Sequence, residues 1–309
     1  MTRSDRRRRL RLQDLLLLLL LWIGLCSSFE KDEQQHRDYL KGLKRIVYSF
    51  TTTQRRIDRI RETLDSIVSK QTVPVDAVLL NVGPDIVIPE WLLTYAKEEE
   101  RLKIVRMKKD YGPASKLLGA LNEGNESGED TLIVFGDDDI VVSPKIVQLH
   151  IQAQDQAKVP TAFGTRRIHI GHDLGIDPPE TVLEATGTIS VRASFLPREA
   201  TEGLNRAPDA CRLSDDYWIS HFLTSANVRL EELPSCVYSW SLGRWPADSC
   251  GSPFYELSHL AGLGALSQVR VTEDGILIPN MKGDWRDQLA RYALCRSLYF
   301  NPPDETFSL

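Results

Sequence analysis

The chain has 309 residues, of which 42% are hydrophobic and 26% are charged, and its formal net charge is −5. These proportions are those of a folded protein long enough to bury a sizeable core. The first 14 residues carry six arginines and two aspartates, a net charge of +4, which leaves −9 for the rest. A body that acidic argues against general nucleic-acid binding, which needs a basic face.

The N-terminus combines a basic head with an apolar run. We expect a cytosolic head over residues 1–14, a signal anchor or signal peptide over 15–29, a stem over 30–43 and a folded domain over 44–309. The uncharged run from Leu15 to Cys26 is shorter than the ~20 residues of a full membrane span, so a retained anchor, a cleaved signal and a peripheral or buried helix all stay open. The positive-inside rule places the folded domain in the lumen of the secretory pathway. We expect an ER or Golgi membrane location, or secretion if the segment is cleaved.

Two further features fit a lumenal domain. Asn125-Glu126-Ser127 is an N-glycosylation sequon in a segment rich in Gly and Glu, which favours a loop. Beyond Cys26 the chain has an even set of cysteines, namely Cys211, Cys236, Cys250 and Cys295. Two disulfides with three connectivities are open, and the alternative is a set of reduced thiols.

Apolar runs alternate with helical patterns from residue 46 to residue 135. Strands are expected over 46–50, 77–82, 103–107 and 131–135, with helices over 57–68, 91–101 and 114–121. This alternation predicts an α/β fold with a mostly parallel sheet flanked by helices. Ligands bind beyond the carboxyl ends of such strands, so the loops after Phe50, Val82, Met107 and Phe135 are the relevant ones.

The pattern is less regular after Lys145. Residues 161–167, 186–193 and 228–233 favour strands, whereas 214–225 and 285–300 favour helices. No internal repeat marks a second domain.

The acidic triplet Asp137-Asp138-Asp139 follows the fourth expected strand. Adjacent ionised carboxylates repel one another, and Mn²⁺ or Mg²⁺ is the usual relief. Alternate residues of a strand share a side, so Asp137 and Asp139 are expected to point together while Asp138 faces away and holds the turn. The alternative is a solvated acidic turn or a helix N-terminus, since Ser143-Pro144 begins a plausible helix.

A second motif, Asp110 to Lys116, follows the third expected strand and opens a helix. Pro113 suits the first turn, and the N-terminus of a helix favours an anion. Lys116 would add positive charge near a diphosphate, and Asp110 would bind a base or ribose. The alternative is a helix cap with a surface lysine.

A third motif is Ser214-Asp215-Asp216. Ser is a good N-cap and acids suit the first helical turn, so helix capping alone explains these residues. The functional interpretation is that one carboxylate takes the proton from an acceptor hydroxyl as a general base.

The order of these motifs carries a resemblance. The segments DYGPASKLLGAL (110–121), TLIVFGDDDIVVSP (131–144) and LSDDYWIS (213–220) resemble the GT-A nucleotide-diphospho-sugar transferase fold. The chain is most similar to family 2-like glycosyltransferases with a short N-terminal anchor, over roughly residues 44–233. The triplet with AFGTRR (162–167) also resembles the exostosin-like branch.

The resemblance implies roles for individual residues. Asp137 and Asp139 would form a DXD motif that holds Mn²⁺ or Mg²⁺ on the donor diphosphate. Asp216 or Asp215 would be the catalytic base, and Gly187 would lie on the acceptor side. The donor-binding residues would be Thr51, Thr52, Arg56, Asp110, Lys116 and Asp137. One departure is that no clear product-release histidine or second metal motif is found.

The implied activity is that of a metal-dependent glycosyltransferase over residues 44–309. It would move a sugar, of hexosyl or N-acetylhexosaminyl type, from a nucleoside-diphosphate sugar to a hydroxyl-bearing glycan or protein acceptor in the secretory pathway. The alternatives are a sugar-nucleotide nucleotidyltransferase and a catalytically inactive GT-A binding protein. The donor sugar, the acceptor and the stereochemical outcome are not indicated.

Overall fold

The computed structural model describes residues 45–127, 130–171, 179–184, 187–196, 211, 214–233, 254–256, 270–271, 277–278 and 285–297. The chain divides into two units, Met1–Gly42 and Leu43–Leu309, and all described residues belong to the second. The expected head, the apolar segment 15–29 and the stem 30–43 lie outside the described residues. Within the described part, no helix is long and apolar enough to cross a membrane.

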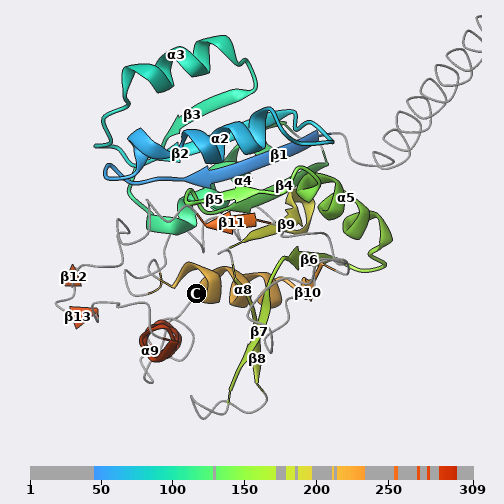
Figure 1. The fold of residues 1–309 in the computed structure, drawn as a ribbon. Helices are drawn as coiled ribbons and strands as arrows, with labels where there is room; N and C mark the ends of the chain where they lie inside the picture. The colour runs from blue at the N-terminus through green and yellow to red at the C-terminus, as the bar shows by residue number, and fades with distance from the viewer. Residues whose placement is uncertain are drawn as a thin grey trace, which may run out of the picture. The chain divides into compact units, whose positions relative to one another are not determined.

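A seven-stranded sheet with the order β10-β6-β9-β4-β1-β2-β3 forms the centre of the second unit (Figure 1). Its strands are β1 (Arg45–Thr51), β2 (Ala77–Val82), β3 (Leu102–Arg106), β4 (Thr131–Gly136), β6 (Thr161–Gly164), β9 (Thr188–Arg192) and β10 (Arg229–Glu232). All neighbouring pairs are parallel except those of β9, which runs antiparallel to both β4 and β6. The predicted mostly parallel sheet is therefore confirmed.

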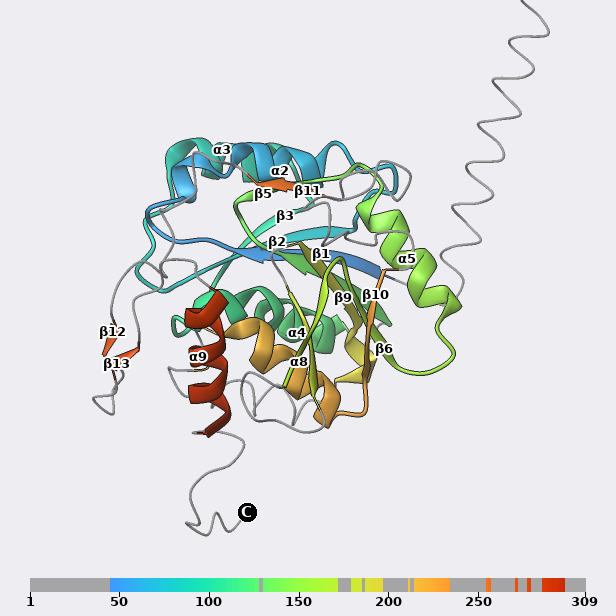
Figure 2. The same ribbon diagram turned by 60° about the horizontal axis from the view of Figure 1, so that its bottom comes forward.

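Helices cover both faces of this sheet. They are α2 (Arg61–Val68), α3 (Glu90–Glu98), α4 (Ser115–Ser127), α5 (Ile146–Gln156), α8 (Asp215–Ser225) and α9 (Trp285–Cys295). Figure 2 shows α2 and α3 over one face, with α4 and α8 over the other. Strands β2 and β4 are buried along their whole length. Their continuous apolar runs are explained by this covering on both sides.

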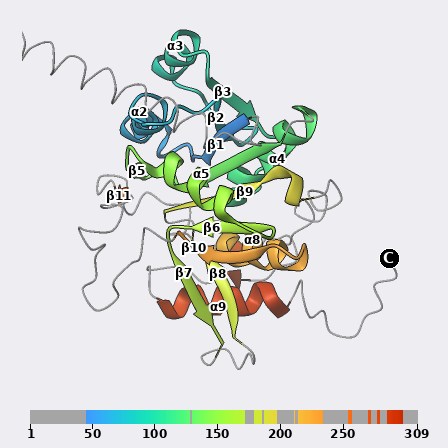
Figure 3. The same cartoon turned by 90° about the vertical axis from the view of Figure 1, so that its right-hand side faces the viewer.

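Three short antiparallel pairs lie outside the main sheet. They are β5 (Ile140–Val142) with β11 (Phe254–Glu256), β7 (Arg167–Ile170) with β8 (Glu180–Leu183), and β12 (Arg270–Val271) with β13 (Leu277–Ile278). The β7–β8 hairpin extends away from the main sheet (Figure 3). Its base lies beside α8 and β10, which matters for the pocket described below.

Three expectations about local structure are corrected. The run 161–167 is not one strand, because the chain turns at Thr165, whose backbone N–H donates to Thr188 O at 2.9 Å, and β7 then pairs in another sheet. The sequon 125–127 forms the end of helix α4 and does not lie in a loop. The residues after the acidic triplet form strand β5, and the following helix begins only at Ile146.

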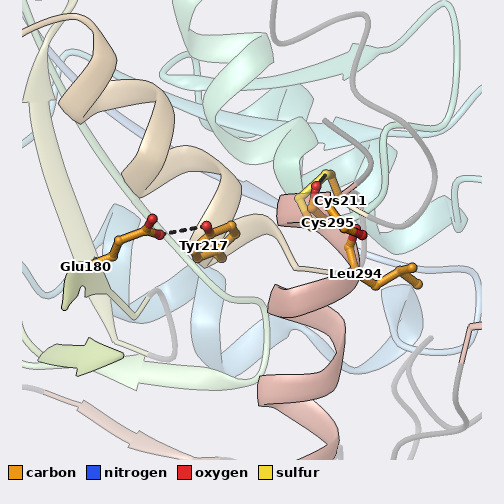
Figure 4. The surroundings of a disulfide bond; sticks show 6 residues. Glu180, Cys211, Tyr217, Leu294 and Cys295 are labelled. Carbon is orange, nitrogen blue, oxygen red and sulfur yellow. Dashed lines mark hydrogen bonds between the residues drawn. A yellow bond between two sulfur atoms is a disulfide. The ribbon is translucent and has the colours of Figure 1, made fainter. Parts of the chain in front are cut away.

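A disulfide joins Cys211 to Cys295 (Figure 4). Cys211 stands just before α8 and Cys295 ends α9, so this bond ties the two segments together. This bond identifies one of the cysteine pairs that the sequence leaves open. The alternative of reduced thiols therefore does not apply to these two residues. Cys236 and Cys250 lie outside the described residues.

Candidate active site

The acidic triplet follows β4 at the carboxyl edge of the sheet. Strands β1 and β4 are parallel, with Ser49 opposite Phe135, so both end at this edge. The edge is where a ligand of a parallel sheet is expected.

Asp138 holds the turn. Its carboxylate accepts hydrogen bonds from Thr52 Oγ1 and from Arg56 Nη1, each at 2.6 Å, and its carbonyl accepts one from Thr63 Oγ1 at 2.8 Å. Burial raises the pKa of Asp138, while Arg56 and Thr52 oppose that rise. Asp138 therefore holds the turn as expected. The expected alternation of the triplet is not found, because Asp139 lies 3.2 Å from the same Arg56 Nη1 whereas Asp137 pairs with Lys116. Thr52 and Arg56 contact this turn, and their contact with a nucleotide stays a prediction.

Lys116 joins the triplet to helix α8. Its Nζ lies 2.8 Å from Asp137 Oδ1 and 2.7 Å from Asp215 Oδ2, and its side chain is only 1% exposed. Burial alone would lower the pKa of Lys116, but Asp137, Asp215 and Asp216 raise it well above its usual value. The alternative of a surface lysine is wrong.

Two local features fix the start of helix α4 and with it the position of Lys116. A 3₁₀ turn over Gly112–Ala114 precedes the helix, and Gly112 has φ 61°, a left-handed conformation that glycine adopts without strain. The Lys116 carbonyl accepts a hydrogen bond from Ser49 Oγ of β1 at 2.5 Å. The first turn of α4 is thereby attached to the central strand.

The acidic pair Asp215 and Asp216 begins α8. Ser214 stands at the N-cap position without a side-chain cap hydrogen bond, and both acids lie in the first helical turn, where the helix dipole favours them. Burial, together with the charge of Asp215, raises the pKa of Asp216 well above its usual value, and Lys116 opposes this rise. Strongly shifted carboxyls of this kind cluster at catalytic sites.

Gly136 and Gly187 bring β4 and the start of β9 close together. A Cβ on Gly136 would lie 2.6 Å from the Gly187 carbonyl oxygen and 2.9 Å from the Tyr48 hydroxyl. The Tyr48 hydroxyl is buried and has no hydrogen-bond partner among the described residues. The structure thus places Gly187 beside Gly136, the residue that precedes the triplet. The expected role of Gly187 on the acceptor side stays a prediction.

Thr51 is the last residue of β1, and Asp110 follows β3 at the same edge of the sheet. Thr51 Oγ1 donates to the Asn81 carbonyl at 2.8 Å, and Asp110 Oδ1 accepts from the Gly112 N–H at 2.8 Å. A Cβ on Gly83 would lie 3.7 Å from Asp110 Cβ, so the loops after β2 and β3 adjoin. Both residues lie at the edge where a donor is expected. Neither of these two hydrogen bonds involves the acidic triplet.

The carboxylates of Asp137 and Asp139 meet some of the requirements of a site for a divalent cation. Asp137 and Asp139 are 30% and 27% exposed, and they pair with Lys116 and Arg56. Burial raises the pKa of Asp137 to about 6, with Lys116 opposing and Asp139 adding to the rise. Among the described residues, no group of three or more His, Cys, Asp or Glu could hold a metal ion. Two partly exposed carboxylates nevertheless suit Mn²⁺ or Mg²⁺, which completes its shell with substrate phosphates and water.

Sequence reasoning missed Glu184 and gave no individual role to Arg166, which lies in the segment AFGTRR. Glu184 follows β8, is buried, and its Oε2 lies 2.7 Å from Arg166 Nε. Its charge contributes to the raised pKa of Asp216. An acid directly after the apolar pair Val182-Leu183 is the signal that could have drawn attention to it.

Comparisons with known proteins add the following. The model of glycosyl transferase family 2 matches residues 50–212, just over half of the chain. No curated protein matches the chain. None of the comparisons supports the expected similarity to the exostosin-like branch.

Two of the solved structures that match the chain are the following. Glucosyl-3-phosphoglycerate synthase from Mycobacterium tuberculosis, in complex with Mn²⁺, uridine diphosphate and glucosyl-3-phosphoglycerate, is 14% identical. The alignment covers 65% of this chain and 73% of that one, with a TM-score of 0.38. For 4-diphosphocytidyl-2C-methyl-D-erythritol synthase the identity is 13%, the coverage is 62% of this chain and 89% of that one, and the TM-score is 0.38.

Proposed function

This chain belongs to glycosyl transferase family 2, and we propose that it is a metal-dependent GT-A enzyme that moves a sugar from a nucleoside-diphosphate sugar to a hydroxyl acceptor. The observation that carries the proposal is the burial of Lys116 between Asp137 and Asp215. This lysine brings the acidic triplet and the acidic pair of α8 to one place. Donor chemistry and acceptor deprotonation need such carboxylates side by side.

The donor side of the site is the edge formed by the ends of β1, β3 and β4. Asp137 and Asp139 would hold Mn²⁺ or Mg²⁺, which would neutralise the diphosphate leaving group when bound. Asp138 stays with Thr52 and Arg56 and keeps the turn rigid. The remaining donor contacts come from the loops that carry Thr51 and Asp110.

The two acids of α8 have different tasks. Asp215 Oδ2 lies 2.7 Å from the Lys116 ammonium, so this carboxylate is engaged in an ion pair. Asp216 has a pKa raised by burial, which makes its carboxylate the better proton acceptor. We therefore assign Asp216 as the general base and Asp215 as the residue that positions Lys116. The sequence alone leaves this choice open.

The cellular setting belongs to the same proposal. Transfer of a hexosyl or N-acetylhexosaminyl group to a glycan or protein would take place in the secretory pathway, in the ER or Golgi lumen. Residues 15–29 would attach the chain to the membrane, or would be cleaved to release it. The support for this setting is the sequence of the N-terminal segment and the Cys211–Cys295 disulfide, which is typical of oxidising compartments.

The metal assignment is tested with Asp139→Ala. Calorimetric titration of the full chain with UDP and with GDP, each with and without Mn²⁺, should show Mn²⁺-dependent binding of one nucleotide. The variant should lose that dependence while its melting temperature stays unchanged, because Asp139 is partly exposed. Asp58→Ala, at an exposed position of the first 3₁₀ turn, is the control and should bind like the wild type. Wild-type affinity in Asp139→Ala would contradict the assignment.

A further inference from the structure

A pocket of about 630 Å³ lies between β8, α8 and β10, away from the acidic triplet. Its walls include Glu180 and Thr181 of β8, His221 and Thr224 of α8, and Arg296 beyond the end of α9. This volume lies within the range of about 300–1,000 Å³ that is usual for small-molecule sites. None of the residues in the proposed catalytic site lines it.

The groups around the pocket are held in place before any ligand arrives. Glu180 Oε2 accepts a hydrogen bond from the Tyr217 hydroxyl at 2.6 Å, and Glu180 Oε1 lies 3.1 Å from Arg296 Nε. Tyr217 stacks on Tyr292 of α9 with 5.2 Å between ring centroids. Figure 4 shows the Glu180–Tyr217 bond and, nearby, the disulfide that ties Cys295, the residue before Arg296, to the start of the α8 segment. Ordered walls lower the entropic cost of binding.

The charges of the pocket are paired. Glu180 pairs with Arg296, and Glu231 lies 2.9 Å from Arg167 and 3.7 Å from Arg229. Burial lowers the pKa of His221, so its imidazole is neutral near pH 7. A phosphate or carboxylate ligand would therefore meet balanced charge among the described lining residues. The pocket offers many hydrogen-bonding groups, and the charges of its described lining residues cancel. Such a lining suits an uncharged compound with many hydroxyl groups.

Helix α8 connects this pocket with the proposed catalytic base. Asp216 stands in its first turn, whereas Tyr217, His221 and Thr224 follow at the spacing of one helical face. With a rise of about 1.5 Å per residue, Thr224 lies ~12 Å along the axis from Asp216. A short sugar chain whose reacting hydroxyl lies at Asp216 can extend that far along the helix.

We propose that this pocket binds an uncharged sugar unit of an extended glycan acceptor, at a distance from the hydroxyl that reacts. The proposal rests on the proposed function, because it names the class of acceptor for the same enzyme. It favours an oligosaccharide over a single sugar as the acceptor, since a monosaccharide could not occupy both places.

Two neighbouring residues of α8 offer a matched test. Thr224 and Ser225 are both exposed in the last turn, and the hydroxyl of each donates to the carbonyl four residues before it at 2.9 Å. Only Thr224 lines the pocket. Thr224→Tyr therefore fills the pocket, whereas Ser225→Tyr adds the same ring beside it. Equal melting temperatures of the two variants would show that a difference in sugar binding between them does not come from a difference in folding.

The probes are maltotriose, mannotriose and chitotriose, and the readout is saturation-transfer NMR with the full chain. The wild type and Ser225→Tyr should bind one of these sugars equally, and Thr224→Tyr should bind it at least about tenfold more weakly. Equal binding by all three proteins, or no binding of any trisaccharide by the wild type, would overturn the proposal.

The same experiment separates this proposal from the proposed function. Trisaccharide binding that depends on Thr224, in a chain that turns over no nucleotide sugar, would retain the pocket as a sugar site and reject the enzyme. Sugar transfer by the wild type with an unchanged acceptor KM in Thr224→Tyr would retain the enzyme and reject the pocket.

Discussion

The described chain up to Asp139 and the part after it are built differently. In the first part, β1, β2, β3 and β4 are parallel and alternate with helices. In the second part, β9 runs antiparallel, a hairpin leaves the sheet, and a disulfide joins residues 84 positions apart. The strands and helices of the first part each follow a regular local pattern of apolar residues, whereas the pattern of the second part is less regular.

The proposed active site lies where these two parts meet. Lys116 of α4 contacts Asp215 of α8, and Gly136 of β4 adjoins Gly187 before β9. The first part thus supplies the donor edge and the second supplies the acidic pair. Losing the ion pair of Lys116 at this junction should therefore cost more stability than losing an exposed ion pair within one part.

The largest effect is expected for Lys116→Met. Removing this cation, whose side chain is 1% exposed, takes the partner from Asp137 and Asp215, which should lower the free energy of unfolding by about 3–5 kcal/mol. Urea unfolding measures the change. Lys103→Met is the control, because Lys103 is 48% exposed and its ion pair with Glu123 should contribute less than about 1 kcal/mol. Equal losses in the two variants would mean that Lys116 does not join the two parts.

The next effect is confined to the second part. The double variant Cys211→Ser, Cys295→Ser removes a crosslink over 84 residues, and a loss of about 2–5 kcal/mol is expected for such a bond. Binding of UDP or GDP with Mn²⁺ should remain, since the donor edge belongs to the first part. Loss of nucleotide binding together with stability would show that the two parts are not separable in this way.

Much of the first part could be predicted from the sequence. The strands expected over 46–50, 77–82 and 131–135 appear as β1, β2 and β4, and each boundary differs by at most one residue. Long apolar runs between helical patterns leave few alternatives for such strands. The turn-holding role of Asp138 was also predicted, but not for the reason given, because residues 137–139 form a turn between β4 and β5 to which strand alternation does not apply.

The second part could be predicted only in pieces. The helix over 214–225 appears as α8, but the ion pair between Lys116 and Asp215 spans 99 positions and no local pattern indicates it. The disulfide of Cys211 was one of several equal choices, and the turn at Thr165 depends on its bond to β9. The pocket at Glu180 was missed, because it forms only when β8, α8 and the end of α9 come together.

The contact between the two parts at Gly136 should have a moderate effect. In Gly136→Ala the new Cβ would meet the Gly187 carbonyl at 2.6 Å, a backbone atom that cannot move freely. We expect a loss of about 1–3 kcal/mol, measured by thermal or urea unfolding. Gly83→Ala is the matched control, since its nearest neighbours lie at 3.7 Å. If Gly83→Ala is the more damaging change, this close approach is not what Gly136 provides.

The last effect depends on pH and concerns His150 of α5, whose ring contacts two residues of β9. Its ring nitrogens lie 2.8 Å from Ser190 Oγ and from Thr188 Oγ1, and burial lowers its pKa to about 3. The unfolded chain binds a proton below about pH 6.5, but the folded chain does not until about pH 3. Stability present above pH 6.5 should therefore be lost on acidification, at up to ~1.4 kcal/mol per pH unit.

His150→Gln should remove this contribution. The difference in unfolding free energy between wild type and variant should shrink as the pH falls from 6.5 to 4.5, and urea titrations at several pH values measure it. A difference that stays constant over this range would contradict the lowered pKa.

The most direct test of the central claim is nucleotide release by the full chain. UDP- and GDP-sugars are supplied with Mn²⁺ and candidate glycan acceptors, and the released nucleoside diphosphate is measured for the wild type and for Asp216→Asn. We predict Mn²⁺-dependent release from one donor and a loss of about 100-fold or more in the variant, because a general base contributes that much. Release of pyrophosphate from a nucleoside triphosphate instead, no turnover of any donor, or equal turnover in Asp216→Asn would contradict the account.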